Sequence, residues 1–429
     1  MDMVFGRDLV SETGARANVA QNIRTSLKRI AETDAAVEAF EEEPDRDARL
    51  ARTATDNSGP LRGATLGVKD IFAVDGLPTT GGSELDPSEF AGPEASTVTL
   101  LRRAGATVVG KTKTAEFACV HPPSTRNPHD LRRTPGGSSS GSAAAVATGA
   151  VTLATGTQTI GSVIRPASYC GVAGFKTTQG GVPLDGVIPC APSYDSFGLF
   201  ATSVPGLVLG ASVLFEEEQP NARNPVVAVP AHEYLTQATE TTNEVFGAAV
   251  RDLAESGLDI LRTDLVADIA VLSRTQKVIF DAEFARAHED RFRRHGSLLG
   301  AGTTEVIRRG LAISEGAYAA AVDELAEQRS AFDTRMEQEG IDLVVAPAAA
   351  DVAPLGLSST GSPVMSLPWS HFGLPCVTIP LPRDVGELPL GLQLVGRRHT
   401  DLQLLGWASE VAAGLGKLTG RQPGSRPRL

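Results

Sequence analysis

The chain has 429 residues, and its 39 Lys and Arg against 51 Asp and Glu give a formal net charge of −12. This acidic balance argues against non-specific binding to nucleic acid or to anionic membranes, both of which need a basic surface. Four Cys are too few for a disulfide framework and are typical of a reducing compartment. With no export signal and no run of roughly 18 apolar residues, we expect a cytoplasmic protein that does not span a membrane.

The predicted elements start with a helix over residues 14–42, where apolar residues recur at helical spacing. From residue 60 onward, short β-branched strands alternate with helices. The strands are predicted at 64–68, 106–109 and 151–154, and the helices at 96–103 and 142–148. This alternation is typical of an α/β fold whose sheet is covered by helices on both faces.

Residues 215–340 are richer in charge and in helical periodicity, which predicts a mainly helical insertion. Strands return at 342–346, 377–380 and 391–395, and a last helix follows at 401–413. We therefore predict one domain over 1–429 with a mixed, largely parallel central sheet. Its core would be residues 60–200, and residues 341–413 would return to the same sheet.

Two short motifs match functional patterns without the structure that those patterns need. Residues 105–112 fit the phosphate-loop pattern, but the four residues between the glycines are Ala-Thr-Val-Val, which favour a buried strand. Residues 137–141 fit G-x-S-x-G, but a polar, Pro-containing loop precedes them where a nucleophile elbow needs a strand. We expect neither a nucleotide site nor an α/β-hydrolase elbow.

A longer constellation is more specific. Lys69 lies in Leu-Gly-Val-Lys-Asp, Ser138 follows Thr-Pro-Gly-Gly, and Ser162 lies in Ile-Gly-Ser-Val-Ile-Arg-Pro. In order and spacing these segments resemble the amidase signature family, over residues 59–195 and again over 342–405. The resemblance implies the amidase signature fold, in which these three residues form a Ser-cisSer-Lys catalytic triad.

The chemistry of amide cleavage explains why such residues are used. A serine hydroxyl is a weak nucleophile until a base takes its proton, and a lysine can be that base when burial keeps its amine uncharged. The resemblance implies that Ser162 is the nucleophile, which forms an acyl-enzyme, and that Ser138 relays the proton to Lys69. It also implies a cis Gly137–Ser138 peptide bond and no metal or cofactor.

The resemblance further implies an oxyanion hole built from the backbone N–H groups of Thr159, Ile160, Gly161 and Ser162. The family usually has Gly-Gly before the nucleophile, whereas this chain has Ile160-Gly161. Either Ile160 has an ordinary φ angle or the loop has shifted, since a β-branched residue at positive φ is strained. We expect an intact hole with an apolar side chain near the substrate; the alternative is an inactive paralogue.

Arg165 follows the nucleophile by three residues, an arrangement similar to the malonamidase-like branch of the family. There the arginine holds a substrate carboxylate, as guanidinium geometry favours. The alternative is a structural pairing of Arg165 with an Asp or a carbonyl group. Both interpretations remain open at this point.

The leading hypothesis is an enzyme that hydrolyses an amide bond of a small molecule. Carbamates, ureas and aryl esters remain open as substrates, as does a role as the amidase component of a glutamine-dependent tRNA amidotransferase. We expect neither nucleic acid nor membrane as a partner of the hydrolase, and a homodimer stays open. The pocket walls are expected from residues 280–320 and from the surroundings of Tyr194, Trp369 and His371.

Overall fold

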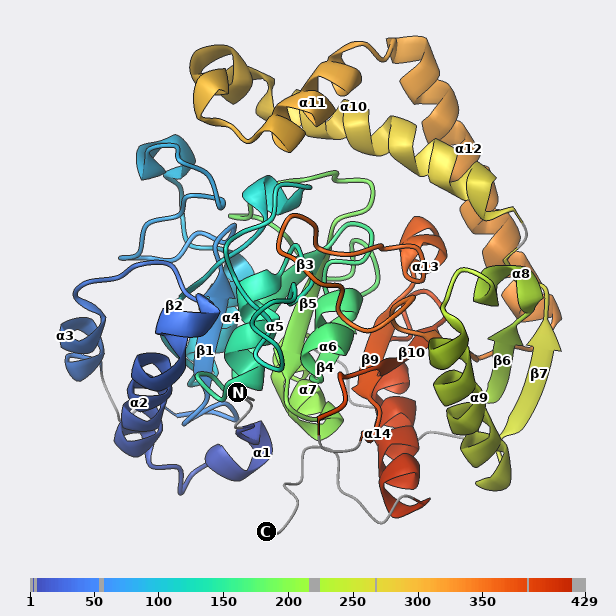
Figure 1. Cartoon of the computed structure of the whole chain (residues 1–429), viewed down its shortest axis with the longest axis horizontal. Helices are drawn as coiled ribbons and strands as arrows, with labels where there is room; N and C mark the ends of the chain where they lie inside the picture. Colours follow the sequence, from blue (N-terminus) through green and yellow to red (C-terminus); the bar gives the residue numbers. More distant parts are fainter. Residues whose placement is uncertain are drawn as a thin grey trace.

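The computed structural model describes residues 3, 6–53, 58–215, 224–266, 268–383 and 386–418. Within these residues the centre of the molecule is a ten-stranded sheet (Figure 1) with the order β2-β1-β3-β5-β4-β9-β10-β8-β6-β7. The strands are β1 (Thr65–Lys69), β2 (Thr107–Thr112), β3 (Leu153–Gln158), β4 (Ala173–Lys176), β5 (Ser196–Ala201), β6 (Val226–Pro230), β7 (Asp259–Thr263), β8 (Leu343–Pro347), β9 (Cys376–Pro380) and β10 (Gly391–Gly396).

The sheet is mixed, as predicted. Parallel pairs join β2, β1 and β3 at one end and β7, β6 and β8 at the other. Antiparallel pairs through β5, β4, β9 and β10 connect the two ends. Residues 107–112 of the phosphate-loop pattern are the buried strand β2, which agrees with the interpretation of that motif as a strand.

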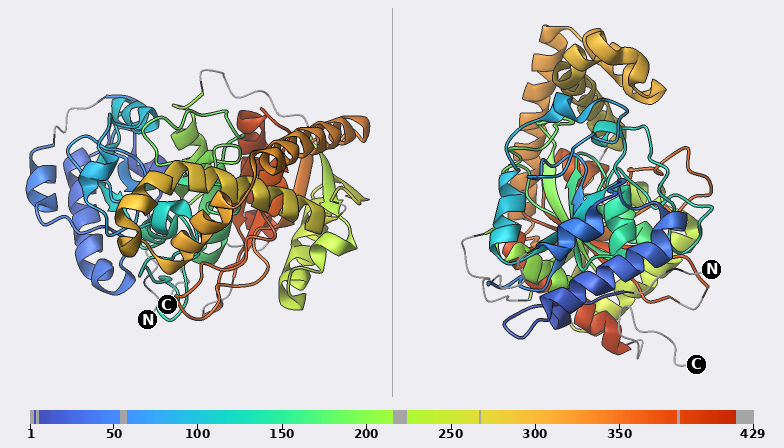
Figure 2. Two further views of the ribbon diagram at one scale, coloured as in Figure 1. Left: turned by 90° about the horizontal axis from the view of Figure 1, so that it is seen from above. Right: turned by 90° about the vertical axis from the view of Figure 1, so that its left-hand side faces the viewer.

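Helices cover both faces of the sheet (Figure 2), which confirms the predicted fold class. Side chains alternate along the strands, so that Leu199 packs into one core and Phe200 into the other. The first core receives α4 (Ser96–Arg103), α7 (Val204–Ala211) and α14 (Asp401–Leu418). The second receives α2 (Val19–Val37), α5 (Ser140–Ala147) and α6 (Ile164–Cys170).

Helix α5 is buried on all sides, because its residues after the first turn are Ala, Ala, Ala, Val and Ala. A Cβ atom at Gly141 would lie 2.2 Å from the carbonyl oxygen of Ala39 and 2.5 Å from the backbone nitrogen of Lys113. Only glycine therefore allows the first turn of α5 to approach these two segments so closely. This approach fixes the loop that carries Ser138, which ends where α5 begins.

The segment 215–340 is mainly helical, with α8 (His232–Leu235), α9 (Glu240–Glu255), α10 (Ile269–His295), α11 (Ala301–Leu311) and α12 (Glu315–Gln338). It also supplies β6 and β7 to the sheet, two strands that the sequence analysis did not predict. Helices α10, α11 and α12 form a layer across the top of the molecule in Figure 1. No helix in the described part of the chain is long and apolar enough to cross a membrane.

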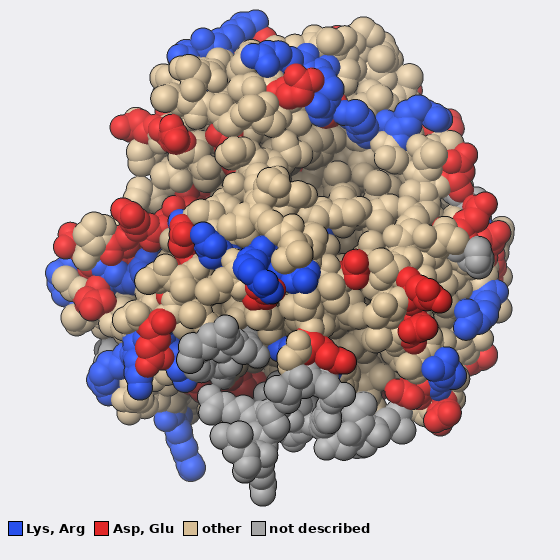
Figure 3. Space-filling view, viewed as in Figure 1, with Lys and Arg blue, Asp and Glu red and all other residues tan. Residues whose placement is uncertain are grey.

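Lys and Arg side chains gather over this helical layer, along the upper edge of the face in Figure 3. Carboxylates partly neutralise them. Arg294 pairs with Glu89 at 2.6 Å and Arg309 with Asp281 at 2.9 Å. Part of the positive charge along this edge is therefore paired with carboxylates.

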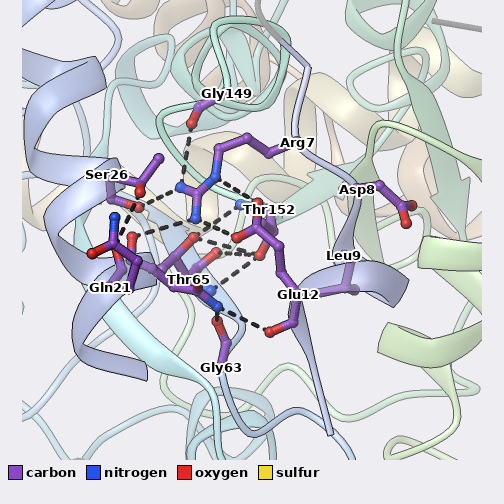
Figure 4. A network of polar contacts seen from close by, with 12 residues as sticks. Arg7, Asp8, Leu9, Glu12, Gln21, Ser26, Gly63, Thr65, Gly149 and Thr152 are labelled. Atoms are coloured by element: carbon purple, nitrogen blue, oxygen red, sulfur yellow. Dashed lines mark hydrogen bonds and ion pairs between the residues drawn. The ribbon is translucent and has the colours of Figure 1, made fainter. Parts of the chain in front are cut away.

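A buried arginine fastens the N-terminal segment to the sheet (Figure 4). Arg7 has 6% of its side chain exposed and forms a two-pronged ion pair with Glu12. It also donates to Ser26 Oγ at 2.8 Å and to the carbonyl oxygen of Gly149 at 3.4 Å. These contacts tie α1 (Leu9–Glu12), α2 and the start of β3 together, since Gly149 lies just before that strand.

We predict that Arg7→Ala lowers the free energy of unfolding by about 2 to 3 kcal/mol, because Glu12 and the buried Ser26 hydroxyl lose their hydrogen bonds to a charged donor. Chemical denaturation measures this change. The matched control is Arg132→Ala, since Arg132 pairs with Asp130 while 80% of its side chain is exposed. The control is expected to leave stability unchanged, and equal losses in both variants would contradict the importance of the Arg7 contacts.

Candidate active site

Lys69 is the last residue of β1 and is fully buried. Its Nζ lies 2.8 Å from both Ser138 Oγ and Thr157 Oγ1. Thr157 reaches it because β1 and β3 run in parallel with Gly67 beside Ala154, so that the two strands end at the same edge of the sheet. Burial lowers the pKa of Lys69 from 10.5 to about 7.

The neighbouring carboxylate does not neutralise this lysine. Asp70, the next residue, forms its ion pair with Lys111, at 2.6 Å. Asp70 also accepts hydrogen bonds from the backbone and side chain of Thr80. The side chain of Lys69 therefore faces two hydroxyl groups rather than an acid, which is the environment that the proposed base needs.

Ser138 lies in the loop before α5 and is 2% exposed. The Gly137–Ser138 peptide bond is cis, as the family resemblance implied. The Ser138 carbonyl oxygen accepts hydrogen bonds from the N–H groups of Ala115 and Ser140, at 3.0 and 2.9 Å. The backbone of Ser138 is thus held from two sides while its hydroxyl faces Lys69.

Ser162 lies in the loop between β3 and α6 and is 8% exposed. Within the described ranges its Oγ makes no hydrogen bond, so the Lys69–Ser138 contact is formed and a Ser138–Ser162 contact is not. Arg165 connects the two serine loops. Its Nη2 donates to the Gly137 carbonyl oxygen at 2.6 Å, and its Nη1 lies 3.2 Å from where a Cβ of Gly161 would be.

The backbone of the 160–162 loop suits an oxyanion hole. In the described structure the N–H groups of Ile160, Gly161 and Ser162 donate to no protein group, whereas those of Val163 and Ile164 donate to Gln158 Oε1. Ile160 is not among the residues with positive φ, so it occupies its position without needing the conformational freedom of glycine. The hole itself stays a prediction.

Asp195 is a site residue that the sequence analysis missed. Its carboxylate accepts hydrogen bonds from Thr159 Oγ1 at 2.6 Å and from the N–H groups of Cys190 and Ala191 at 2.8 and 3.0 Å. Burial raises the pKa of Asp195, and these hydrogen bonds partly oppose that rise. Asp195 joins the 190s loop to the residue before Ile160. No motif marks Asp195, because its contacts arise only when β3 and β5 pair.

Arg165 is buried and has no carboxylate partner in the described structure. Its Nη2 also donates to Thr360 Oγ1 at 3.0 Å, while its Nε and Nη1 are buried and have no hydrogen-bond partner. Burial lowers the pKa of Arg165 to about 10, which leaves it charged at neutral pH. Two unsatisfied cationic donors in a buried position are costly unless a ligand accepts from them.

A cavity of about 330 Å³ adjoins Lys69 through Thr157 and Asp195. Its walls are mostly apolar and come from the strand-to-strand segments around 71, 118 and 179–192. Of the surroundings of Tyr194, Trp369 and His371, expected as pocket walls, only Pro192 and Asp195 beside Tyr194 are in its lining, and the three aromatic residues themselves are fully buried. The described residues contain no group of three or more His, Cys, Asp or Glu that could hold a metal ion.

Helix α10 supports this cavity from outside, although no residue of 280–320 lines it. His288 Nε2 lies 2.9 Å from the Pro189 carbonyl oxygen, and the His288 ring stacks on Phe117 with centroids 4.4 Å apart. Burial lowers the pKa of His288 to about 3, so the ring is neutral. Pro189 and Ala118, the residue after Phe117, both line the cavity.

Comparison with known proteins places the chain in a family. Residues 21–405 match the model of the amidase family. The chain belongs to the amidase family. A solved structure described as an amidase superposes with a TM-score of 0.83 at 30% identity, covering 96% of this chain and 100% of that one. The coarse class is therefore an amidase-family enzyme that acts on carbon–nitrogen bonds.

Other members of the amidase family are also similar to this chain. The amidase-family component of the glutamyl-tRNA(Gln) amidotransferase from Chloroflexus aurantiacus is 32% identical over 441 residues, which cover 88% of this chain and 90% of the relative. The structure of the same component from Thermotoga maritima superposes with a TM-score of 0.77 at 27% identity, covering 95% and 93% of the two chains. Hydrolases and an amidotransferase component thus share this fold.

We predict that burial of Lys69 makes stability depend on pH. Between its folded pKa of about 7 and its ordinary value of 10.5 the unfolded chain binds a proton that the folded chain does not, so stability rises with pH. Lys69→Met should remove about 1.4 kcal/mol per pH unit from that slope. Denaturation between pH 7.5 and about 9.5 measures it, and parallel slopes in the two proteins would show an ordinary lysine.

Proposed function

We propose that the protein hydrolyses the amide bond of a small molecule through an acyl-enzyme on Ser162. The observation that carries the proposal is the environment of Lys69, whose buried Nζ contacts two hydroxyl groups, with its pKa lowered to about 7. An amine in this state can accept a proton near neutral pH. The chain order and spacing of the three residues support the same assignment.

In the proposed mechanism neutral Lys69 takes the proton of Ser138 while Ser138 takes that of Ser162. Ser162 Oγ then attacks the amide carbonyl carbon, and the carbonyl oxygen becomes an oxyanion facing the N–H groups of residues 160–162. The proton returns along the same path to the leaving amine as the C–N bond breaks. Water then attacks the acyl carbonyl carbon while its proton passes through Ser138 to Lys69. The bond between the acyl group and Ser162 Oγ breaks, Ser162 regains a proton by the same path, and the acid is released. Catalytic hydrogen bonds are often formed only with substrate bound, which suits the open Ser162 hydroxyl.

Arg165 and the cavity suggest what the substrate offers. The unsatisfied Nε and Nη1 of Arg165 would bind a carboxylate beside the 160–162 loop, which is the malonamidase-like interpretation. The apolar cavity next to Thr157 would hold an uncharged portion. We therefore propose an amide with a carboxylate group as the substrate class. Carbamates, ureas and aryl esters are alternatives, because the same acyl chemistry cleaves them.

A second candidate is the amidase component of a glutamine-dependent tRNA amidotransferase. The observation that favours it is the 32% identity to such a component over 88% of this chain. The free chain would then hydrolyse glutamine poorly and would need partner proteins for its biological reaction. An inactive binding paralogue, the third hypothesis, would show no turnover that depends on Ser162.

We predict that Ser162→Ala and Ser138→Ala each lower kcat/KM by a factor on the order of 10⁴ on any amide that the purified protein hydrolyses, because the triad acts as one unit. A panel of amides and glutamine, assayed for ammonia release, measures this loss. Ser409→Ala is the control, since that hydroxyl bonds only within α14. Activity that survives Ser162→Ala would contradict the assignment of the nucleophile.

We also predict that kcat/KM rises about tenfold per pH unit below pH 7 and levels off above it. Protonated Lys69 cannot accept a proton, so activity follows the neutral fraction of a group whose pKa is about 7. Steady-state kinetics from pH 5.5 to about 9 measure this profile. A flat profile across that range would mean that Lys69 is not the base.

For Arg165→Ala we predict a change in substrate preference. The ratio of kcat/KM for succinamate to that for its neutral analogue succinamide should fall about 10- to 100-fold, because a bond to a charged group is lost. A ratio is used because Arg165 also holds Gly137, so that both activities are expected to fall. Arg165→Lys, which keeps the charge, should retain part of the preference. An unchanged ratio in Arg165→Ala would leave only a structural role.

A further inference from the structure

The loop that contains Ile160 and Gly161 is attached to a distant part of the chain by two buried side chains. Gln158 ends β3, and Ser370 lies in α13 (Leu367–His371); both are fully buried. Gln158 Nε2 donates to Ser370 Oγ at 3.0 Å, and Ser370 Oγ donates to the Ile160 carbonyl oxygen at 2.6 Å. The hydroxyl of α13 therefore connects the end of the strand to the loop that follows it.

The direction of these hydrogen bonds is fixed by the groups at each end. The N–H groups of Val163 and Ile164 are donors, so the amide oxygen of Gln158 must face them and its NH₂ must face Ser370. A serine hydroxyl has a single proton, and Ser370 already accepts from Gln158. Its proton is therefore directed to the Ile160 carbonyl oxygen.

Because the peptide unit is planar, the hydrogen bond from Ser370 to the Ile160 carbonyl oxygen also fixes the direction of the Gly161 N–H group. In a trans peptide unit the carbonyl oxygen and the following N–H point in opposite directions. Because Ser370 holds the Ile160 oxygen, the Gly161 N–H points away from α13. The Gly161 carbonyl oxygen accepts a hydrogen bond from the backbone N–H of Arg165 at 3.1 Å. By the same planarity, this bond fixes the direction of the Ser162 N–H group. Both N–H groups are left without an acceptor in the described part of the protein.

We infer that Gln158 and Ser370 are positioning residues that aim the Gly161 N–H at the oxyanion of the acyl-transfer step. This inference rests on the proposed function, because an oxyanion forms only if Ser162 attacks a carbonyl group. Neither side chain touches the substrate. They act through the Ile160–Gly161 peptide unit, which they hold from the side opposite to its N–H.

The test compares Ser370→Ala with Ser366→Ala. Both serines are buried and lie four residues apart at the same short helix, but Ser366 Oγ faces Gln393 rather than the loop. For Ser370→Ala we expect kcat to fall about 10- to 100-fold with KM within about threefold, since loss of a whole oxyanion donor gives roughly 10²- to 10³-fold. Ser366→Ala should keep both parameters near their original values.

A second measurement distinguishes an effect on the orientation of the Gly161 N–H group from a general loss of packing around Ser370. Phenylboronic acid becomes tetrahedral and anionic when the Ser162 oxygen adds to boron, so its affinity reports on the hole directly. We expect this affinity to fall in Ser370→Ala by the same factor as kcat. Gln158→Glu should have a similar effect, because a carboxylate would take the Ser370 proton from the Ile160 oxygen. The double variant should be no worse than the more impaired single variant, since both act through one chain of bonds.

The outcomes distinguish this inference from the proposed function. Unchanged phenylboronic acid affinity in a folded Ser370→Ala protein would overturn the inference, and so would equal kcat values for Ser370→Ala and Ser366→Ala. Failure of the original protein to bind phenylboronic acid through Ser162 would overturn it too. If the original protein binds phenylboronic acid but cleaves no amide, the proposed function fails, and the fall in affinity still supports the positioning role.

Discussion

The candidate active site depends on a lysine that is buried with no carboxylate in direct contact. In water an ammonium group is strongly solvated, and folding removes that solvation from Lys69 while offering the hydroxyls of Ser138 and Thr157 and the more distant charge of Asp195 in return. Lys111 shows the contrast. It is nearly as buried, but its ion pair with Asp70 offsets part of the desolvation. Lys111 thus has a carboxylate beside its amine, whereas Lys69 contacts two hydroxyl groups, which is the environment that the proposed base requires.

The mixed sheet brings the parts of the site together. The ends of β1 and β3 supply Lys69 and Gln158, the loop before α5 supplies Ser138, and α13 reaches the same place from the last third of the chain. Parallel strands end at a common edge, and that edge is where open α/β sheets usually bind ligands. The helical layer acts indirectly: His288 of α10 contacts Pro189, and Pro189 lines the cavity.

The three candidate catalytic residues could be proposed from the sequence because each lies in a short segment whose flanking residues are specific. It also predicted α4 with the observed bounds, and α2 and α14 within a few residues, from apolar periodicity. It could not predict the Gln158–Ser370 contact, which joins residues 212 positions apart, nor the role of Asp195. β7 escaped prediction because it is a partly exposed edge strand with the sequence Asp-Ile-Leu-Arg-Thr, which lacks clear alternation. Of the expected pocket walls, Pro192 and Asp195 beside Tyr194 do line the cavity, whereas nothing from residues 280–320 or from the surroundings of Trp369 and His371 does.

The close packing of α5 limits how this protein can vary. Gly141 sits where even a methyl group would overlap the main chain on two neighbouring segments, so the helix cannot be relocated by small repacking. The walls of the apolar cavity differ, because a side chain there can be exchanged without moving the backbone. A change of cavity shape can therefore leave the separation of Lys69 and Ser138 unaltered, whereas a change at Gly141 cannot.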